Sequence, residues 1–160
     1  MTTVPVRYLP KTLSKKDRER QRKSLKRSRQ AYKRGHYVSR PRVKSFKSRK
    51  SNHIKTAERM YGIKTLRLNR ELAKRTRCRL EGLKKIVKKG QGAYYSSGSR
   101  PNQTAHSWGY ARLASSITGG NAAAVDNHIL EKYCEPSSRA LRLSRRAKKR
   151  GTRRAKSTRL

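Results

Sequence analysis

Residues 104–136, TAHSWGYARLASSITGGNAAAVDNHILEKYCEP, decide the fold that this chain is expected to adopt. Thr104 is a suitable N-cap for a helix from 105 to about 117, and Gly119-Gly120 would end that helix. Asn121 would cap a second helix that ends before Pro136, so the two helices would form an αα-hairpin. The apolar residues expected to form the core of the domain are Trp108, Leu113, Ile117, Val125, Ile129 and Leu130.

Three more helices are predicted upstream of this hairpin. Ser51 would cap the first, Asn69 would cap the second, and the third would span about 79–89 and supply the layer on which the hairpin packs. Residues 91–103 are rich in glycine and serine, which is typical of turns. The predicted fold class is therefore mainly α, a small helical domain of short helices at residues 51–135.

The charge of the chain is large and unevenly distributed. The 160 residues include 46 Lys+Arg and 8 Asp+Glu, which gives a formal net charge of +38. Residues 1–90 carry +27 and residues 136–160 carry +11, whereas residues 91–135 have no net charge. Self-repulsion opposes compaction in the charged flanks but not in the neutral core region. We therefore expect long extended basic arms at both ends, at residues 1–50 and 136–160.

The N-terminal arm contains one predicted charged helix, at about residues 14–34. Ser14 and Asp17 approximate a capping box, and Gly35 is a suitable C-terminal stop. Few apolar residues interrupt the Lys and Arg of this helix, which leaves it almost no face to bury. It should be stable only against an anionic surface, and the segment that follows, 36–50, is expected to be extended.

Positive charge of this density requires an anionic partner, either the phosphates of nucleic acid or an acidic protein surface. The residues expected to bind that partner lie in the charged helix and in the C-terminal tail. They are Arg18, Arg20, Arg22, Lys23, Lys26, Arg27, Arg29, Arg34, Arg139, Arg142, Arg145, Arg146, Lys148, Lys149 and Arg150.

The sequence contains no convincing catalytic or metal-binding pattern. Asp126 and His128 are two residues apart, which places them on different faces of a helix, so a Ser/His/Asp set is not expected. Cys78 and Cys134 match neither a zinc spacing nor a disulfide framework, and they are expected to be two small buried or half-buried thiols. The glycines at 90–98 match no phosphate-binding loop. We therefore expect no enzymatic activity, no cofactor and no metal.

Residues 92–112 are polar, aromatic and glycine-rich, and they contain the only tryptophan. Packing and ordering of their own backbone is the expected role of these residues, and a functional pocket is the alternative. In that alternative, Tyr95, Arg100 and His106 are the candidate contacts to an anion or a base.

Membrane contact is not indicated, because the sequence has no long apolar run and no basic amphipathic helix with a bulky apolar face. It also has no N-terminal apolar segment of the signal-peptide type, which favours an intracellular origin.

The chain resembles an uncharacterised family of small, highly basic proteins encoded by nucleocytoplasmic large DNA viruses, which include giant and algal-type viruses. Two stretches carry the resemblance: VRYLPKTLSKKDRERQRKSLKRSRQAYKRGHYVSRPRVKSFKSRKSNHIKTAERMYGI and GAYYSSGSRPNQTAHSWGYARLASSITGGNAAAVDNHIL. Together they span about residues 5–135, and the tail from 136 onward lies outside the resemblance. The resemblance implies a virus-encoded protein carried in the particle, and it supplies no catalytic residues.

The expected function is that of a non-enzymatic virion structural protein, a minor capsid or scaffolding component that binds the inner capsid shell through its basic arms. Its expected partners are capsid proteins, in many copies, and its expected location is the capsid interior after assembly in the cytoplasm of the infected cell. Two alternatives stay open. One is a histone-like protein that condenses the packaged DNA, and the other is an enzyme acting on nucleic acid or a nucleotide.

Overall fold

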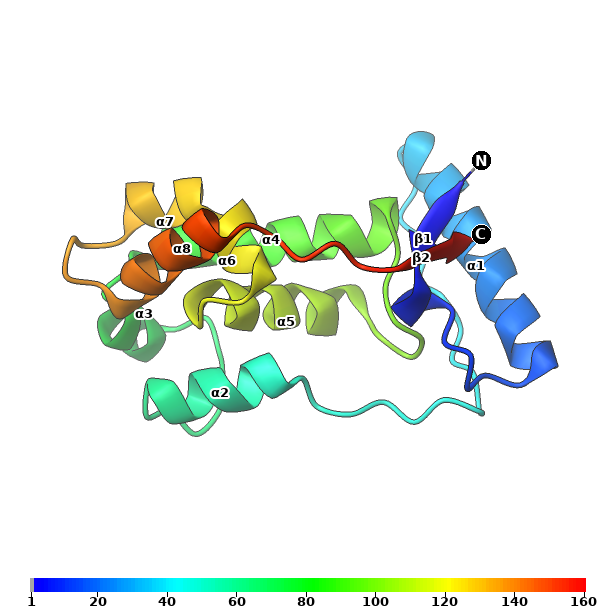
Figure 1. Ribbon diagram of the computed structural model, residues 1–160, viewed down its shortest axis with the longest axis horizontal. Helices are drawn as coiled ribbons and strands as arrows, with labels where there is room; N and C mark the ends of the chain where they lie inside the picture. Colours follow the sequence, from blue (N-terminus) through cyan, green and yellow to red (C-terminus); the bar gives the residue numbers. More distant parts are fainter. Residues whose placement is uncertain (1) are drawn as a thin grey trace. The chain divides into compact units, whose positions relative to one another are not determined.

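The computed structural model describes residues 2–160 and is mainly helical, which confirms the predicted fold class (Figure 1). The described residues form two compact units. The first unit comprises residues 2–49, 91–108 and 154–160, and the second comprises residues 50–90 and 109–153. Each unit is therefore assembled from segments that lie far apart in the sequence.

Helices make up nearly all the regular structure of the second unit. They are α2 (Asn52–Met60), α3 (Arg70–Thr76), α4 (Leu80–Ser96) through residue 90, α5 (Ala105–Ile117) from residue 109, α6 (Asn121–Val125), α7 (Asn127–Tyr133) and α8 (Arg139–Arg150). The Ser51 and Asn69 caps are confirmed, because their side chains accept the backbone N–H groups of His53 and Leu72. Local capping thus determines where α2 and α3 begin.

One apolar cluster holds the second unit together. Its fully buried side chains include Leu83, Ile86, Leu113 and Ile117, and Ile129 and Leu130 pack into the same cluster. The predicted core residues of the hairpin are thereby confirmed at Leu113, Ile117, Ile129 and Leu130.

The predicted second helix of the hairpin is broken at Asp126 into α6 and α7. The Asp126 side chain is buried, and its carboxylate accepts hydrogen bonds from Arg112 Nε at 3.0 Å and Nη2 at 2.8 Å. A buried ion pair rather than an apolar stripe therefore fixes the break. Val125, which was expected in the core, is 51% exposed because it ends the short α6 on the solvent side.

Cys78 and Cys134 form a disulfide, which corrects the expectation of two free thiols. The same two residues pair as an isolated antiparallel β-bridge between the segment before α4 and the end of α7. A single pair of cysteines 56 residues apart has no framework pattern, so their pairing depends on the tertiary fold and is invisible to local spacing.

The predicted C-terminal arm is not confirmed, because residues 139–150 form α8 and pack onto the second unit. Its buried residues are Ala140, Leu141, Ser144 and Ala147. Small side chains at intervals of three and four positions form a narrow buried face, while Lys and Arg occupy the exposed face. This face is easily missed in a sequence dominated by arginine.

The first unit contains the two ends of the chain. Its elements are β1 (Thr3–Pro5), the 3-10 helix η1 (Val6–Tyr8), α1 (Lys15–Lys33), the last part of α4, the first turn of α5 and β2 (Ser157–Arg159). The strands β1 and β2 lie side by side and antiparallel, with Val4 opposite Thr158 (Figure 1). The first residues described are therefore paired with the C-terminal segment rather than extended as a free arm.

The charged helix predicted at 14–34 is confirmed as α1, with Ser14 accepting the Asp17 backbone N–H. The helix nevertheless has a buried face, because Asp17, Gln21, Leu25 and Ser28 recur every three or four residues. Leu25 belongs to a small apolar cluster with Val4, Tyr8 and Leu9.

Trp108 packs against this cluster, edge-on to Tyr8 with a distance of 5.9 Å between the ring centroids. The tryptophan therefore serves the first unit, and not the hairpin core for which it was expected. Its own helix begins as predicted, since Thr104 Oγ1 accepts the Ser107 backbone N–H at 3.0 Å.

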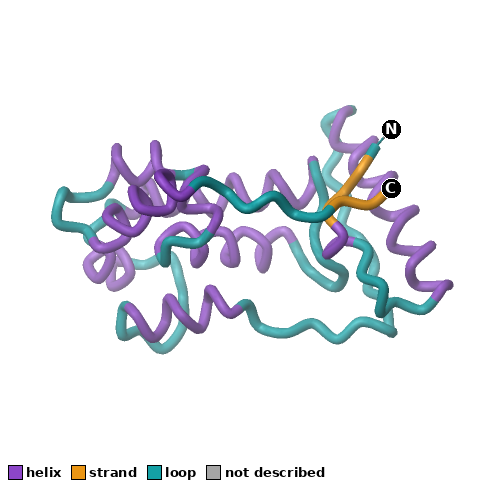
Figure 2. The backbone as a smooth tube through the Cα atoms, viewed as in Figure 1, coloured by secondary structure: helices purple, strands orange, loops and turns teal. Residues whose placement is uncertain are grey.

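The segment between α1 and α2 has no helix and no strand, as expected for residues 36–50 (Figure 2). The amide of Asn102 fixes part of it by bonding the backbone N–H of Val43 at 2.7 Å and the carbonyl of Phe46 at 2.7 Å. The predicted turn region at 91–103 is helical up to Ser96, because α4 continues past its three glycines.

Candidate cationic binding surface

The exposed side of α1 carries the candidate binding residues of the first unit. The predicted cations that are exposed on this helix and its C-cap are Arg20, Lys23, Lys26, Arg27 and Arg34. The others are held by the protein itself: Arg18 and Arg29 donate to the carbonyls of Leu9 and Ser97, and Arg22 pairs with a glutamate one turn earlier. The five exposed cations are therefore available to a partner.

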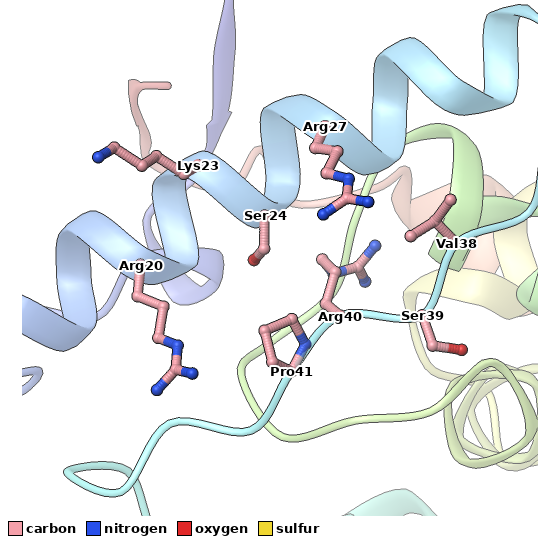
Figure 3. A pocket seen from close by; sticks show the side chains of 8 residues that line it. All are labelled: Arg20, Lys23, Ser24, Arg27, Val38, Ser39, Arg40 and Pro41. Atoms are coloured by element: carbon pink, nitrogen blue, oxygen red, sulfur yellow. The ribbon is translucent and has the colours of Figure 1, made fainter.

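A pocket of about 210 Å³ lies between α1 and the segment 38–41 (Figure 3). Its lining residues are Arg20, Lys23, Ser24, Arg27, Val38, Ser39, Arg40 and Pro41. Three cations come from α1 and the fourth, Arg40, comes from the opposite wall (Figure 3). No acidic side chain lines this pocket.

Arg40 is held more firmly than the other three cations. Its Nη1 donates to Ser28 Oγ at 2.9 Å and to the Tyr94 carbonyl at 2.8 Å, and its Nη2 donates to Ser99 Oγ at 2.8 Å. The guanidinium also lies over the ring of Tyr94, 3.8 Å from its centroid. All these partners are neutral, and burial lowers the pKa of the Arg40 guanidinium from its ordinary value.

Arg40 was not among the residues predicted from the sequence. It stands among many other Lys and Arg residues of the segment 36–50, and its partners Tyr94 and Ser99 lie 54 and 59 residues away. No local signal distinguishes it. Only the fold reveals its role.

The exposed face of α8 forms the candidate surface of the second unit. Its exposed cations without an acidic partner are Arg139, Arg142, Arg146, Lys148, Lys149 and Arg150. Arg145 is engaged instead: its Nε and Nη2 bond the Glu131 carboxylate at 2.7 and 2.8 Å, and this contact lowers the pKa of Glu131 and raises that of Arg145. Arg150 also donates to the Gly119 carbonyl at 3.1 Å.

A second basic hollow lies between α4 and α7 in the same unit. Its volume is about 510 Å³, and it is lined by Lys85, Lys88, Lys89, His128, Ile129, Lys132 and Tyr133. The Lys85 and Lys132 ammonium groups lie 5.2 and 5.4 Å from the centroid of the Tyr133 ring. Lys89 is only partly available, because its Nζ pairs with Asp126 at 3.0 Å.

The three candidate contacts of the 92–112 region line neither of the two hollows described above. Tyr95 is half-buried in an aromatic cluster with Tyr37 and Tyr94, at centroid distances of 5.2 and 5.0 Å. Arg100 and His106 are exposed.

The carboxylate of Asp126 is committed to a structural ion pair. Burial alone would raise its pKa, but the hydrogen bonds and charge of Arg112, together with Ser116 and Lys89, outweigh burial and lower the pKa below its ordinary value. His128 bonds the carbonyl of Val125 instead, so the structure does not bring it into a dyad with Asp126. Within residues 2–160, no three His, Cys, Asp or Glu side chains cluster as metal ligands would.

Most of the positive charge of the protein has no internal counter-charge. Among residues 2–160, five ion pairs engage Arg22, Lys50, Lys89, Arg112 and Arg145, out of 46 Lys+Arg in the chain. Across the same residues, none of the helices has the length and apolar character that a membrane crossing needs. Much of the unpaired charge lies on α1, on α8 and in the segment between α1 and α2.

Comparison with known proteins gives a family but no activity. No curated protein and no solved structure matches the chain. A family model with the description "Family of unknown function (DUF5824)" matches residues 5–132, which include α1 through α6 and most of α7. Since this match covers well over half of the sequence, the chain belongs to the family of unknown function DUF5824.

Proposed function

We propose that this protein is a non-enzymatic structural protein of a large DNA virus particle, and that its cationic helices bind the phosphate backbone of the packaged DNA. The observation that carries the proposal is the unpaired positive charge on ordered helices. Five ion pairs among residues 2–160 engage only five of the 46 Lys+Arg, and a net charge of +38 remains after every acidic residue is counted. The placement in a virus particle rests on the resemblance of residues 5–135 to the viral family of small basic proteins.

The geometry of α1 suits a nucleic-acid backbone. With 19 residues, α1 is about 28 Å long, and duplex DNA presents one phosphate charge per about 1.7 Å of its axis. The exposed cations Arg20, Lys23 and Arg27 follow one face of this helix at intervals of three and four residues. A preformed row of this kind can meet several phosphates without ordering a flexible arm, which lowers the entropic cost of binding.

Salt dependence tests the proposal. The full-length protein is titrated against a short DNA duplex at rising NaCl concentrations, and the logarithm of the binding constant should fall linearly with that of the salt, by about 0.9 for each phosphate contact. Replacing five exposed cations of α1 and its C-cap (Arg20, Lys23, Lys26, Arg27 and Arg34) by Gln should flatten the slope by about 4.

The matched control removes an equal number of arginines and lysines from exposed positions of the second unit. Gln is placed at Arg59, Lys64, Arg67, Arg70 and Lys74. The slope of this variant should stay close to that of the unmodified protein. Weak binding with a shallow slope in the unmodified protein would refute DNA binding, and equal slopes in the two variants would refute the assignment to α1.

A second candidate is a minor capsid protein that binds acidic surfaces on the inner side of the shell. The segment 36–50 favours it, because this segment has no helix or strand and exposes Arg42, Lys44, Lys47 and Arg49. An extended basic segment of this kind could pass between neighbouring acidic subunits, with many weak contacts that act together. Easily screened DNA binding combined with tight binding to purified capsid protein would favour this candidate.

A further inference from the structure

Four cationic side chains line the pocket between α1 and segment 38–41, and the guanidinium groups of Arg27 and Arg40 lie closest together (Figure 3). Arg20, Lys23 and Arg27 project from one face of α1, since residues three, four and seven positions apart are neighbours on a helix. Arg40 faces them from the other wall (Figure 3). Like charges at this spacing repel each other, and no acidic residue lines the pocket, although the charge of Arg20 also acts on Asp17 outside it.

The Arg40 side chain is already oriented before any ligand arrives. Three of its five N–H groups donate to Ser28, Tyr94 and Ser99, and the Tyr94 ring fixes the plane of the guanidinium. The Nε–H and one Nη2–H have no hydrogen-bond partner among residues 2–160. A planar guanidinium with donors to spare, held in place by neutral groups, suits bidentate binding of an oxyanion.

The size of the pocket limits the class of ligand. Sites for whole small molecules usually enclose about 300–1,000 Å³, which exceeds the volume of about 210 Å³ found here. The space suits one tetrahedral anion with its nearest water molecules.

We infer that this pocket is a phosphate-binding site, in which Arg40 is the fixed ligand and Arg20, Lys23 and Arg27 complete the shell of positive charge. The inference deepens the proposed function and rests on it for one source of the ligand, the phosphodiester of bound DNA. The other source with the same chemistry is free phosphate or a phosphomonoester.

Inorganic phosphate is the probe for the site itself. It is titrated into the full-length, isotopically labelled protein at constant ionic strength, and the side-chain Nε–H resonance of Arg40 is followed by NMR. The site predicts a saturable shift with one phosphate per chain. A shift that stays linear with concentration, and equal at all arginines, would overturn it, because it would report only general screening.

Charge-matched variants test which cations form the shell. Arg40 itself is unsuitable for this test, because it also fixes the fold of its unit. Lys23→Gln/Arg27→Gln removes two exposed cations of the pocket, and the control Lys26→Gln/Arg34→Gln removes one Lys and one exposed Arg outside it. The first pair should weaken phosphate binding by about tenfold or more, and the control by less than about twofold. Equal losses in the two variants would overturn the assignment.

Competition distinguishes the two sources of phosphate. If the phosphodiester is the ligand, a short DNA duplex should displace inorganic phosphate from the Arg40 resonance, and Lys23→Gln/Arg27→Gln should lose more DNA affinity than the control. If DNA binds without displacing phosphate, the site stands, but the DNA backbone is rejected as its source. Phosphate binding without any DNA binding would reject the proposed function and leave the site in place.

Discussion

The Arg40 guanidinium lies 3.8 Å from the ring centroid of Tyr94, whose hydroxyl in turn accepts the backbone N–H of Arg40 at 3.0 Å. These two residues are 54 positions apart, and together they fasten the segment after α1 to the last turn of α4 within the first unit. Arg40 therefore makes structural contacts inside the protein, although the chain carries a net charge of +38. These contacts have consequences for stability that differ from those of the exposed cations.

Arg40→Gln should destabilise the protein by about 2 kcal/mol, because Ser28, Ser99 and the Tyr94 carbonyl lose a charged donor. Chemical denaturation measures the change. The control is Arg42→Gln, an exposed arginine two positions away, which should change the free energy of unfolding by less than about 0.5 kcal/mol. Equal stability of the two variants would show that Arg40 is not a structural contact.

Acid should weaken the fold through Asp126. The pKa of this carboxyl is lowered in the folded protein, so its stabilising contribution is fully present above the unfolded pKa of about 3.9 and is lost as the pH falls through the folded value. Asp126→Asn should cost about 3 kcal/mol at neutral pH, because it leaves the Arg112 guanidinium without its carboxylate.

The pH series separates this ion pair from a general effect of acid. Below about pH 4, the stability of the unmodified protein should fall more steeply than that of Asp126→Asn. Glu135→Gln is the control, since this exposed glutamate forms none of the ion pairs found within residues 2–160. Parallel acid profiles for the unmodified protein and Asp126→Asn would contradict the assignment.

Reduction of the Cys78–Cys134 disulfide should destabilise the second unit. A cross-link that closes a loop of 56 residues contributes about 4 kcal/mol in the chain-entropy model. Thermal unfolding with and without reductant should therefore give a lower Tm in the reduced sample. Cys78→Ala/Cys134→Ala should unfold at a low temperature that reductant does not change, and a Tm of the unmodified protein that is insensitive to reductant would contradict the pairing.

Two glycines of α4 should respond in opposite ways to alanine. A Cβ added to Gly82 would collide with the Tyr133 side chain, its Cγ lying 2.6 Å away, so Gly82→Ala should destabilise by about 1–3 kcal/mol. A Cβ added to Gly92 would meet nothing within 4 Å, so Gly92→Ala should stabilise the helix by about 0.5–1 kcal/mol. The two variants compared by thermal unfolding check the packing of α4, and a stabilising Gly82→Ala would contradict it.

Local signals predicted much of this fold. Ser14, Ser51, Asn69 and Thr104 each cap a helix as expected, because a side-chain oxygen near the first N–H groups acts over only a few residues. The prediction that Asn121 caps the second helix of the hairpin was wrong. The N-cap of α6 is Gly120, whose backbone lies close to Ser115.

The features that sequence reasoning missed depend on distant partners. The buried face of α8 consists of small residues such as Ala140 and Ala147, whose burial depends on a neighbouring surface. The break at Asp126 depends on the hydrogen bonds that Arg112 donates to its carboxylate. The position of Arg40 in the wall of the pocket depends on its contact with the Tyr94 ring. Charge density indicated a cationic binding surface, but it could not show which cations are exposed and which are used internally.

The location of the protein in the virus particle tests the proposed function most directly. Particles are opened gently, the DNA is separated from the empty shells, and the protein is quantified in both fractions by mass spectrometry. DNA binding predicts that the protein stays with the DNA and is released by nuclease or by high salt. Recovery with the shells after the DNA has been removed would contradict DNA binding and would favour attachment to the capsid.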